Sequence, residues 1–253
     1  KRDNRIKLIK KNVNEGAYAA RNTGLKYVTG DFITVHDSDD WSHSQKIEIQ
    51  LKELIQNPNA VASISYLIRA RKDVCPLNGG SRLSTKFLVM NSSSLLFRKN
   101  VIEKLGGWDS VRVAGDSEYI WRIEKAFGKE SIIHIEPKLP FSIALSNETS
   151  LTGTSTTHVK TINFGLRRTY REAMQWWHNQ VDSISELYMD PEKYNRHFPC
   201  PVPNRVIKPE SREYDFVFIA DFSSESDLDK LITMINGLIN DNLNVAIFHW
   251  PDY

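Results

Sequence analysis

The stretch VTGDFITVHDSDDW, residues 28–41, constrains the fold more than any other part of this chain. Phe32, Ile33 and Val35 supply the aromatic and β-branched side chains of a buried strand. The strand runs directly into residues 37–40, where three of the four positions hold Asp. Ligands of open α/β sheets bind beyond the carboxyl ends of the strands, so this pattern predicts a ligand site at a strand end.

Strand-like and helix-like patterns alternate along most of the chain, which predicts an α/β fold. Strands are expected at residues 5–9, 31–36, 60–67 and 92–97. Helices are expected from Asn14 to Val28, after a capping box of Ser42 and Gln45, and over residues 117–127 and 162–184. The helix after the capping box would bury Ile47, Leu51, Leu54 and Ile55.

Composition predicts four parts. Residues 1–150 form the main α/β domain, 151–197 a helical extension, and 198–212 a linker with four prolines. Residues 213–253 carry one strand, helix, strand pattern. About forty residues cannot bury a core alone, so this last part is interpreted as the beginning of a second α/β domain.

Charge and hydropathy exclude some classes of protein. The chain has 33 basic and 31 acidic residues, and a net charge of +2 gives no general attraction for nucleic acid. No apolar run approaches the ~18 residues that cross a bilayer. Cys75 and Cys200 lie far apart and form no metal-type pair, which favours a reducing, cytoplasmic setting. The basic stretch KRDNRIKLIKK leaves a peripheral place at the inner face of a membrane open.

Two acidic constellations are candidates for chemistry. The carboxylates of Asp37, Asp39 and Asp40 suit a hard cation such as Mg²⁺ or Mn²⁺ together with a phosphate ligand, although Asp is also common in turns. In GGWDSVRVAGDSEYIWRI, residues 106–123, Asp116 falls at the start of a predicted helix. It is a candidate general base toward a hydroxyl group, or alternatively a helix cap. Glu118 and Arg122 have the spacing of a helix-surface pair.

Read jointly, NVNEGAYAARNTGLKYVTGDFITVHDSDDW and GGWDSVRVAGDSEYIWRI closely resemble the family-2 glycosyltransferases of the GT-A fold, over residues 5–135. The family segment N-x-G-x-x-x-A-R-N-x-G is matched from Asn14 to Gly24 and includes Arg21. Its DxD motif is matched by Asp37 and Asp39. Its acidic residue ahead of a helix with Arg is matched by Asp116 and Arg122.

The resemblance implies a role for each residue. Asp39 would contact Mn²⁺ or Mg²⁺, Asp37 would hold the ribose or the water shell of the metal, and Arg21 would lie near the nucleotide. Asp116 would deprotonate an acceptor hydroxyl, which attacks the anomeric carbon and inverts it. The implied partners are a nucleotide-diphosphate sugar and a glycan or lipid-linked acceptor, in the synthesis of a bacterial surface polysaccharide.

Further residues are weaker candidates. His158 and Arg167 could complete the metal or diphosphate site, as a His or basic residue does in some GT-A enzymes. Trp108 could stack on an acceptor sugar, with Asp109 beside it, or it could be a partly buried aromatic. The chain departs from the family at Gly115, where a Glu is usual. Family members begin with a strand, helix and strand that hold the nucleobase, and the resemblance implies that this sequence starts after them.

Two alternative functions stay open, and the C-terminal unit has a resemblance of its own. A Mg²⁺-dependent phosphohydrolase of the haloacid dehalogenase type also places DxD after a strand, but it predicts Thr or Val where Trp41 stands. A catalytically silent GT-A module could bind a glycan or a partner chain. The C-terminal strand, helix, strand unit resembles the opening of a GT-B transferase.

Overall fold

The computed structural model describes residues 3–77, 86–146, 159–162, 165–193, 196–198, 200, 214–220 and 228–249. The chain forms two compact units, Lys1–Arg205 and Val206–Tyr253. No helix in the described part of the chain is long and apolar enough to span a membrane.

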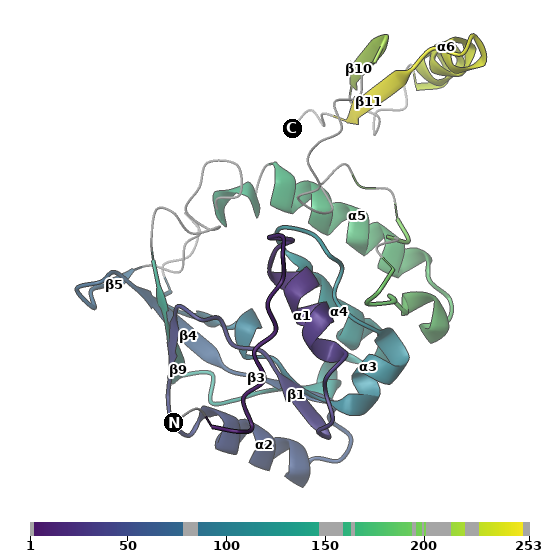
Figure 1. Cartoon of the computed structure of the whole chain (residues 1–253). Coiled ribbons are helices and arrows are strands. Elements are labelled where there is room, and N and C mark those ends of the chain that lie inside the picture. The colour runs from purple at the N-terminus through teal and green to yellow at the C-terminus, as the bar shows by residue number, and fades with distance from the viewer. Residues whose placement is uncertain are drawn as a thin grey trace. The chain divides into compact units, whose positions relative to one another are not determined.

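The centre of the first unit is a four-stranded mixed sheet in the order β1-β7-β3-β8, of which β1 and β3 are labelled in Figure 1. Its strands are β1 (Phe32–Thr34), β7 (Leu96–Arg98), β3 (Ala62–Ile64) and β8 (Ile132–His134). β7 runs antiparallel to both β1 and β3, whereas β3 and β8 are parallel. Apolar residues of these short strands, such as Ile33, Ile64 and Phe97, are buried in the main core.

A second sheet continues from the first, because only the buried Ser65 separates β3 from β4. Its strands are β4 (Tyr66–Ala70), β5 (Pro76–Leu77), β6 (Leu88–Met90), β9 (Pro140–Leu145) and β2 (Asp40–Ser42). β9 lies between β2 and β4. β1 belongs to the first sheet and β2 to the second, so residues 35–39 pass from one sheet to the other.

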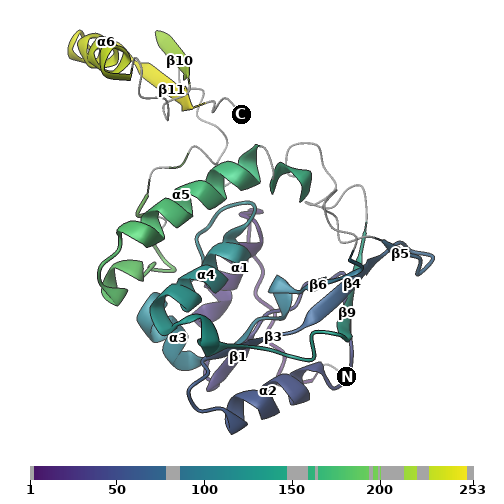
Figure 2. The same cartoon turned by 180° about the vertical axis from the view of Figure 1, so that it is seen from behind.

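Helices cover both faces of the first sheet (Figures 1 and 2). On one face lie α1 (Ala17–Leu25), α3 (Lys99–Leu105) and α4 (Gly115–Phe127), which fill the main core with the sheet. On the other lies α2 (Lys46–Gln56) over a smaller cluster around Leu54. α5 (Leu166–Gln180) packs against α4. Short 3₁₀ turns complete the unit: η1 (Ser92–Ser94), η2 (Lys129–Ser131), η3 (Val159–Ile162) and η4 (Ile184–Leu187).

The predicted apolar face of α2 is partly wrong, because the helix is rotated so that two of the four residues predicted for that face are exposed. Ile47 and Ile55 are 52% and 60% exposed, whereas Gln50 is fully buried. The Gln50 amide donates hydrogen bonds to the carbonyl oxygens of Ser94 (2.8 Å) and Ser63 (3.2 Å). Buried backbone acceptors need such partners, so these bonds set the helix rotation in place of hydrophobic periodicity. The predicted capping box is also wrong, because Gln45 is the N-cap and Ser42 belongs to β2.

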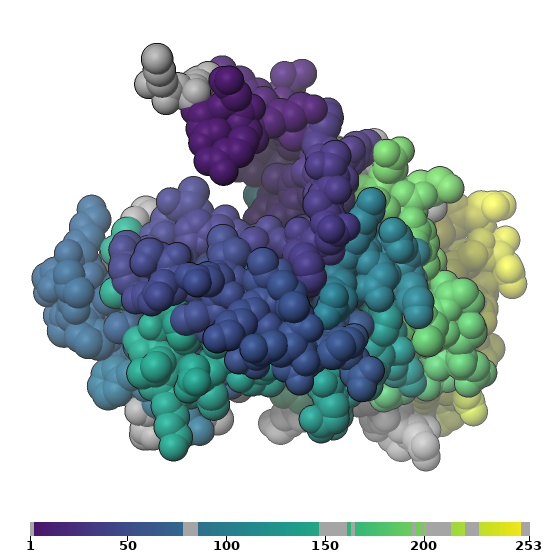
Figure 3. Space-filling model, turned by 90° about the horizontal axis from the view of Figure 1, so that it is seen from below, coloured from purple at the N-terminus to yellow at the C-terminus, as the bar shows by residue number. Residues whose placement is uncertain are grey.

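Two further local predictions are corrected. Residues 5–9 form no strand, because no described strand pairs with them, and Ile6 is 71% exposed. Figure 3 shows this purple segment standing out from the surface of the unit. The helix predicted over 162–184 is shorter, since the backbone becomes extended at Val181. A separate turn, η4, follows it and is capped by Ser183 and Glu186.

The second unit contains β10 (Phe216–Ala220), α6 (Leu228–Asn240) and β11 (Val245–His249). The two strands pair in parallel from Phe216 with Val245 to Ala220 with His249. This confirms the predicted strand, helix, strand pattern. Most of the predicted linker, residues 198–212, lies outside the described residues.

Candidate active site

Asp37 lies on the crossing between the two sheets and connects three elements. The Arg21 guanidinium, from α1, donates from Nη2 to Asp37 Oδ1 over 2.9 Å. The Ser93 hydroxyl, from η1, donates to Asp37 Oδ2 over 2.6 Å. Asn91 orients this turn by accepting the Ser93 backbone N–H. Both carboxylate oxygens of Asp37 therefore already have a protein donor.

Asp39 is in a different position. Its side chain is exposed, and within the described part of the chain it accepts no hydrogen bond and forms no ion pair. Its oxygens are therefore open to a ligand from solvent, and carboxylate oxygens are the donors that Mg²⁺ and Mn²⁺ prefer. No group of three or more His, Cys, Asp or Glu side chains among the described residues forms a cation cage. These residues fit a cation that takes most of its other ligands from substrate and water.

Asp40 adds a third carboxylate at the start of β2. Burial, and then the negative charges of Asp37 and Asp39, raise the pKa of Asp40 to about 6. The positive charges of Arg69 and Lys46 oppose this rise. Lys46 is itself buried, and burial lowers the pKa of its ammonium group. The acidic segment is thus balanced by basic groups from β4 and α2.

A cleft of about 380 Å³ brings the acidic segment together with Asp116, far away in the sequence. We call it the carboxylate cleft. Its other walls come from α1, β4, β6, η1 and β9. It is lined by Ala17, Asp37, Ser38, Asp39, Asp40, Leu67, Arg69, Met90, Asn91, Ser92, Ser93, Asp116, Ala144 and Leu145.

Asp116 is half-buried in the first turn of α4, as predicted for a carboxylate near a helix N-terminus. Ala114, not Asp116, is the N-cap residue, and it adopts a left-handed conformation (φ 64°). Arg167 and Tyr18 lie in the electrostatic surroundings of Asp116. Burial lowers the pKa of the Arg167 guanidinium, and the Asp116 charge opposes that change. Burial, and then the Asp116 charge, raise the pKa of Tyr18.

The two acceptor candidates are corrected by their burial. Trp108 is only 3% exposed, and its ring packs against Tyr119 at 4.7 Å and Phe97 at 6.0 Å between ring centroids. It therefore presents no face to a sugar. Asp109 is 8% exposed and accepts hydrogen bonds from two buried side chains, so it is equally closed to an acceptor. His158 lies outside the described residues.

Glu118 and Arg122 form the predicted pair, but the pair lies in the core and not on the helix surface. Both side chains are fully buried, with Arg122 Nε 2.8 Å from Glu118 Oε1. The guanidinium also donates to the carbonyl oxygens of Leu105 (2.8 Å) and Gly107 (2.6 Å). His178, on α5, lies 3.2 Å from Glu118 Oε1. The pair therefore joins α4 to its neighbours inside the core.

Sequence reasoning missed Ser93, Arg69 and Tyr18. Ser93 belongs to SSSLLF, which was predicted as strand throughout, although Asn91 ahead of three serines is a signal for a capped turn. Arg69 and Tyr18 stand within a strand and a helix, where no local pattern distinguishes them from structural residues.

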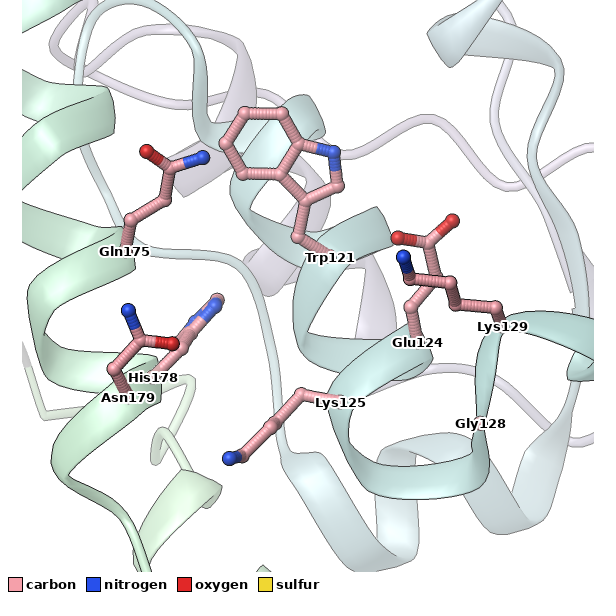
Figure 4. Close-up of a pocket in the computed structure, with 8 residues that line it drawn as sticks. All are labelled: Trp121, Glu124, Lys125, Gly128, Lys129, Gln175, His178 and Asn179. Atoms are coloured by element: carbon pink, nitrogen blue, oxygen red, sulfur yellow. The ribbon is translucent and has the colours of Figure 1, made fainter.

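A second pocket, of about 740 Å³, opens between α4 and α5 (Figure 4). Its lining residues are Trp121, Glu124, Lys125, Gly128, Lys129, Gln175, His178 and Asn179. It is larger than the carboxylate cleft, but its lining contains none of Asp37, Asp39, Asp40 and Asp116. We regard the carboxylate cleft as the candidate active site, because chemistry is decided by the groups present and not by volume.

Residues 1–91 match the family described as Glycosyl transferase family 2. An uncharacterized glycosyltransferase of Rickettsia conorii is 47% identical over 66 residues, which are 26% of this chain and 11% of that protein. The Escherichia coli protein named UDP-Glc:alpha-D-GlcNAc-diphosphoundecaprenol beta-1,3-glucosyltransferase WfgD is 46% identical over 55 residues, 22% of each chain.

An uncharacterized glycosyltransferase of Haemophilus influenzae is 46% identical over 56 residues, again 22% of each chain. The match thus covers between 11% and 22% of the length of these relatives. The matched region includes Arg21, Asp37 and Asp39, whereas Asp116 lies beyond it. The mixed α/β sheet with helices on both faces agrees with this family. Residues 1–91 thus match glycosyl transferase family 2, and the α/β architecture of the first unit is consistent with the GT-A fold of that family.

Proposed function

We propose that this protein is an inverting glycosyltransferase that moves a sugar from a nucleotide-diphosphate donor to a hydroxyl acceptor. One observation carries the proposal: the carboxylate cleft joins the DxD residues of a family-2 domain to Asp116, a carboxylate at a helix N-terminus. A transferase needs a site for the leaving diphosphate and a base for the acceptor within one cleft.

The donor side of the cleft would be formed by the acidic segment. Asp39 is the residue that would hold a divalent cation, Mn²⁺ or Mg²⁺, because its oxygens are not engaged by described residues. When bound, such a cation neutralises charge that develops on the leaving diphosphate. Arg21 keeps Asp37 in place through its 2.9 Å bond, so that Asp37 is oriented toward the nucleotide before binding. Arg167 adds positive charge near Asp116.

The acceptor side would be served by Asp116. Its carboxylate would take the proton of the acceptor hydroxyl as the oxygen attacks the anomeric carbon. Attack from the side opposite the leaving diphosphate inverts the configuration at that carbon. Asp116 lies in the first turn of α4, next to the positive end of the helix dipole.

The acceptor class is inferred from chemistry and from one relative. The WfgD name states an undecaprenol-linked sugar diphosphate as its acceptor. By analogy we propose a glycan or lipid-linked acceptor, in the synthesis of a surface polysaccharide. The N-terminal segment carries exposed Ile6, Leu8 and several lysines, a composition that suits peripheral contact with an anionic membrane surface.

Turnover of the donor tests the proposal. The complete protein would be incubated with a panel of nucleotide-diphosphate sugars and Mn²⁺, and release of the nucleotide diphosphate would be followed with Asp116→Asn and Asp31→Asn beside the parent. Asp31 is an exposed residue just before β1 and serves as the matched control. We expect one donor to turn over, a loss of at least about 100-fold in Asp116→Asn, and parent rates in Asp31→Asn. Full turnover by Asp116→Asn would refute the base, and binding without turnover by the parent would favour the silent module.

A further inference from the structure

The loop of residues 106–114 joins α3 to α4 and leads directly to Asp116. Most of its side chains are buried: Trp108, Asp109, Ser110, Val111, Val113 and Ala114. Its last residue, Ala114, has φ 64°, a conformation that a non-glycine residue keeps only when its surroundings enforce it. The contacts that hold this loop therefore also decide where Asp116 stands.

The side chain of Asp109 is the charged anchor of this loop. The Tyr170 hydroxyl, from α5, donates to Asp109 Oδ2 over 2.9 Å. Arg196 Nε, from the segment after α5, donates to the same oxygen over 2.7 Å. All three side chains are at least nine-tenths buried. Burial raises the pKa of Asp109 and the Arg196 charge opposes that rise, as expected for a buried ion pair.

The position of the Asp109 backbone affects the position of Asp116 through Gly115. Gly115 lies so close to it that an added Cβ at Gly115 would stand 3.1 Å from the Asp109 carbonyl oxygen. On its other side the same Cβ would stand 3.0 Å from the Tyr18 ring. Gly115 is thus packed between Asp109 and α1, and Asp116 is the next residue. A shift of Asp109 must move Gly115, and with it the carboxylate of Asp116.

α1 holds the loop from the opposite side. The Asn22 side chain donates from Nδ2 to the Trp108 carbonyl oxygen (2.7 Å) and accepts the Trp108 N–H (2.9 Å). The neighbouring residue Arg21 binds Asp37. One helix therefore fixes both the loop before Asp116 and the DxD segment, and α5 supplies the second support.

We infer that Asp109, held by Tyr170 and Arg196, is a positioning residue for Asp116, so that the segment from α5 to Arg196 belongs to the catalytic unit of the transferase. This inference rests on the proposed function. It also differs from the division of the chain by composition, in which the transferase domain ended at residue 150. Tyr170 and Arg196 both lie beyond that point and contact the loop directly.

The experiment compares Asp109→Asn, Tyr170→Phe and the pair Arg196→Gln and Arg196→Lys in the complete protein. Met174→Ala is the matched control, because Met174 is fully buried one turn after Tyr170 on α5 and is not one of the two hydrogen-bond donors to Asp109. For each protein the folded fraction is measured by circular dichroism. The Kd for the nucleotide diphosphate and the single-turnover rate of donor consumption are then measured.

We expect Asp109→Asn to lower the turnover rate of folded protein by about 10–100-fold, the effect of a displacement near 1 Å, with the nucleotide Kd unchanged. Tyr170→Phe should show a smaller loss, and Arg196→Lys should retain more of the rate than Arg196→Gln. Met174→Ala should lose stability but keep the rate of its folded fraction. If Asp109→Asn does not fold, the milder Tyr170→Phe and Arg196→Lys variants decide the question.

Two results would overturn the inference and are distinguishable from failure of the proposed function. A parent-like rate in the folded Asp109→Asn and Tyr170→Phe proteins would remove the positioning role while the transferase activity stands. A loss of rate that follows the folded fraction, as expected for Met174→Ala, would leave these residues as stability determinants only. If the parent protein itself consumes no donor, the proposed function fails and the positioning role fails with it.

Discussion

Glu118→Gln tests the buried ion pair of α4 in the most direct way. The substitution keeps the size of the side chain but removes its charge, which leaves the Arg122 guanidinium fully buried opposite a neutral amide. Glu118 contacts Arg122 at 2.8 Å and 3.1 Å, and His178 lies 3.2 Å away. Removing one partner of such a buried pair costs about 3–5 kcal/mol, because the remaining charge is uncompensated.

The matched control is Glu172→Gln, which breaks an i,i+4 pair with Arg168 in which the side chains are 48% and 29% exposed. Exposed pairs of this kind contribute about 0–1 kcal/mol. In a unit of this size the Glu118 cost corresponds to a drop in melting temperature of roughly 6–20 °C, against roughly 0–4 °C for the control.

The assay is thermal and urea unfolding followed by tryptophan fluorescence, since Trp108 and Trp177 are buried in the first unit and report on its core. If the free energy of unfolding of Glu118→Gln is within about 1 kcal/mol of the parent value, or equals that of Glu172→Gln, the charge of Glu118 is not needed to stabilise the buried Arg122. It would mean that Arg122 is satisfied by the carbonyl oxygens of Leu105, Gly107 and Leu187 alone.

Three other predictions concern the carboxylate cleft. Gly115→Ala should lower donor turnover about 10-fold and leave the nucleotide Kd unchanged, because the new Cβ would stand 3.0 Å from the Tyr18 ring and displace Asp116. Equal turnover in parent and variant would contradict this prediction. Ser93→Ala should weaken nucleotide-diphosphate binding about 10-fold in calorimetry, since Asp37 loses a 2.6 Å bond, whereas Asp31→Asn, which is not in the cleft lining, should bind like the parent. Asp40→Asn should flatten the pH dependence of stability between about pH 4 and pH 6, measured by urea unfolding with EDTA. The pKa of Asp40 is raised in the folded state to about 6, so its ionisation costs stability as the pH rises through this window. The cost is about 1–2 kcal/mol after allowance for its partial exposure, and parallel curves for parent and variant would contradict it.

The features predicted correctly depend on local sequence. The strand before the acidic segment, the helix that carries Asp116 in its first turn, and the C-terminal strand, helix, strand unit all follow from short-range patterns. The association of Asp37, Asp39 and Asp116 in one cleft was implied only by the family resemblance, because no spacing in one sequence predicts that the segment after β1 meets the first turn of α4.

The errors depend on contacts between distant residues. Trp108 and Asp109 were acceptor candidates, with a partly buried aromatic as the alternative for Trp108, but Phe97 and Tyr119 pack against Trp108 and Tyr170 binds Asp109. Glu118 and Arg122 have the spacing of a surface pair, and the packing of α3, α5 and η4 against α4 makes them a buried one.

The central claim is that the carboxylate cleft binds a nucleotide diphosphate through a cation held by Asp39. The most direct measurement is calorimetric titration of the complete protein with nucleotide diphosphates, in Mn²⁺ and in EDTA, with Asp39→Asn and Asp31→Asn. We expect one nucleotide diphosphate to bind in Mn²⁺. EDTA and Asp39→Asn should abolish this binding, whereas Asp31→Asn should leave it intact. Equal binding by Asp39→Asn and the parent, or no binding of any nucleotide, would contradict it.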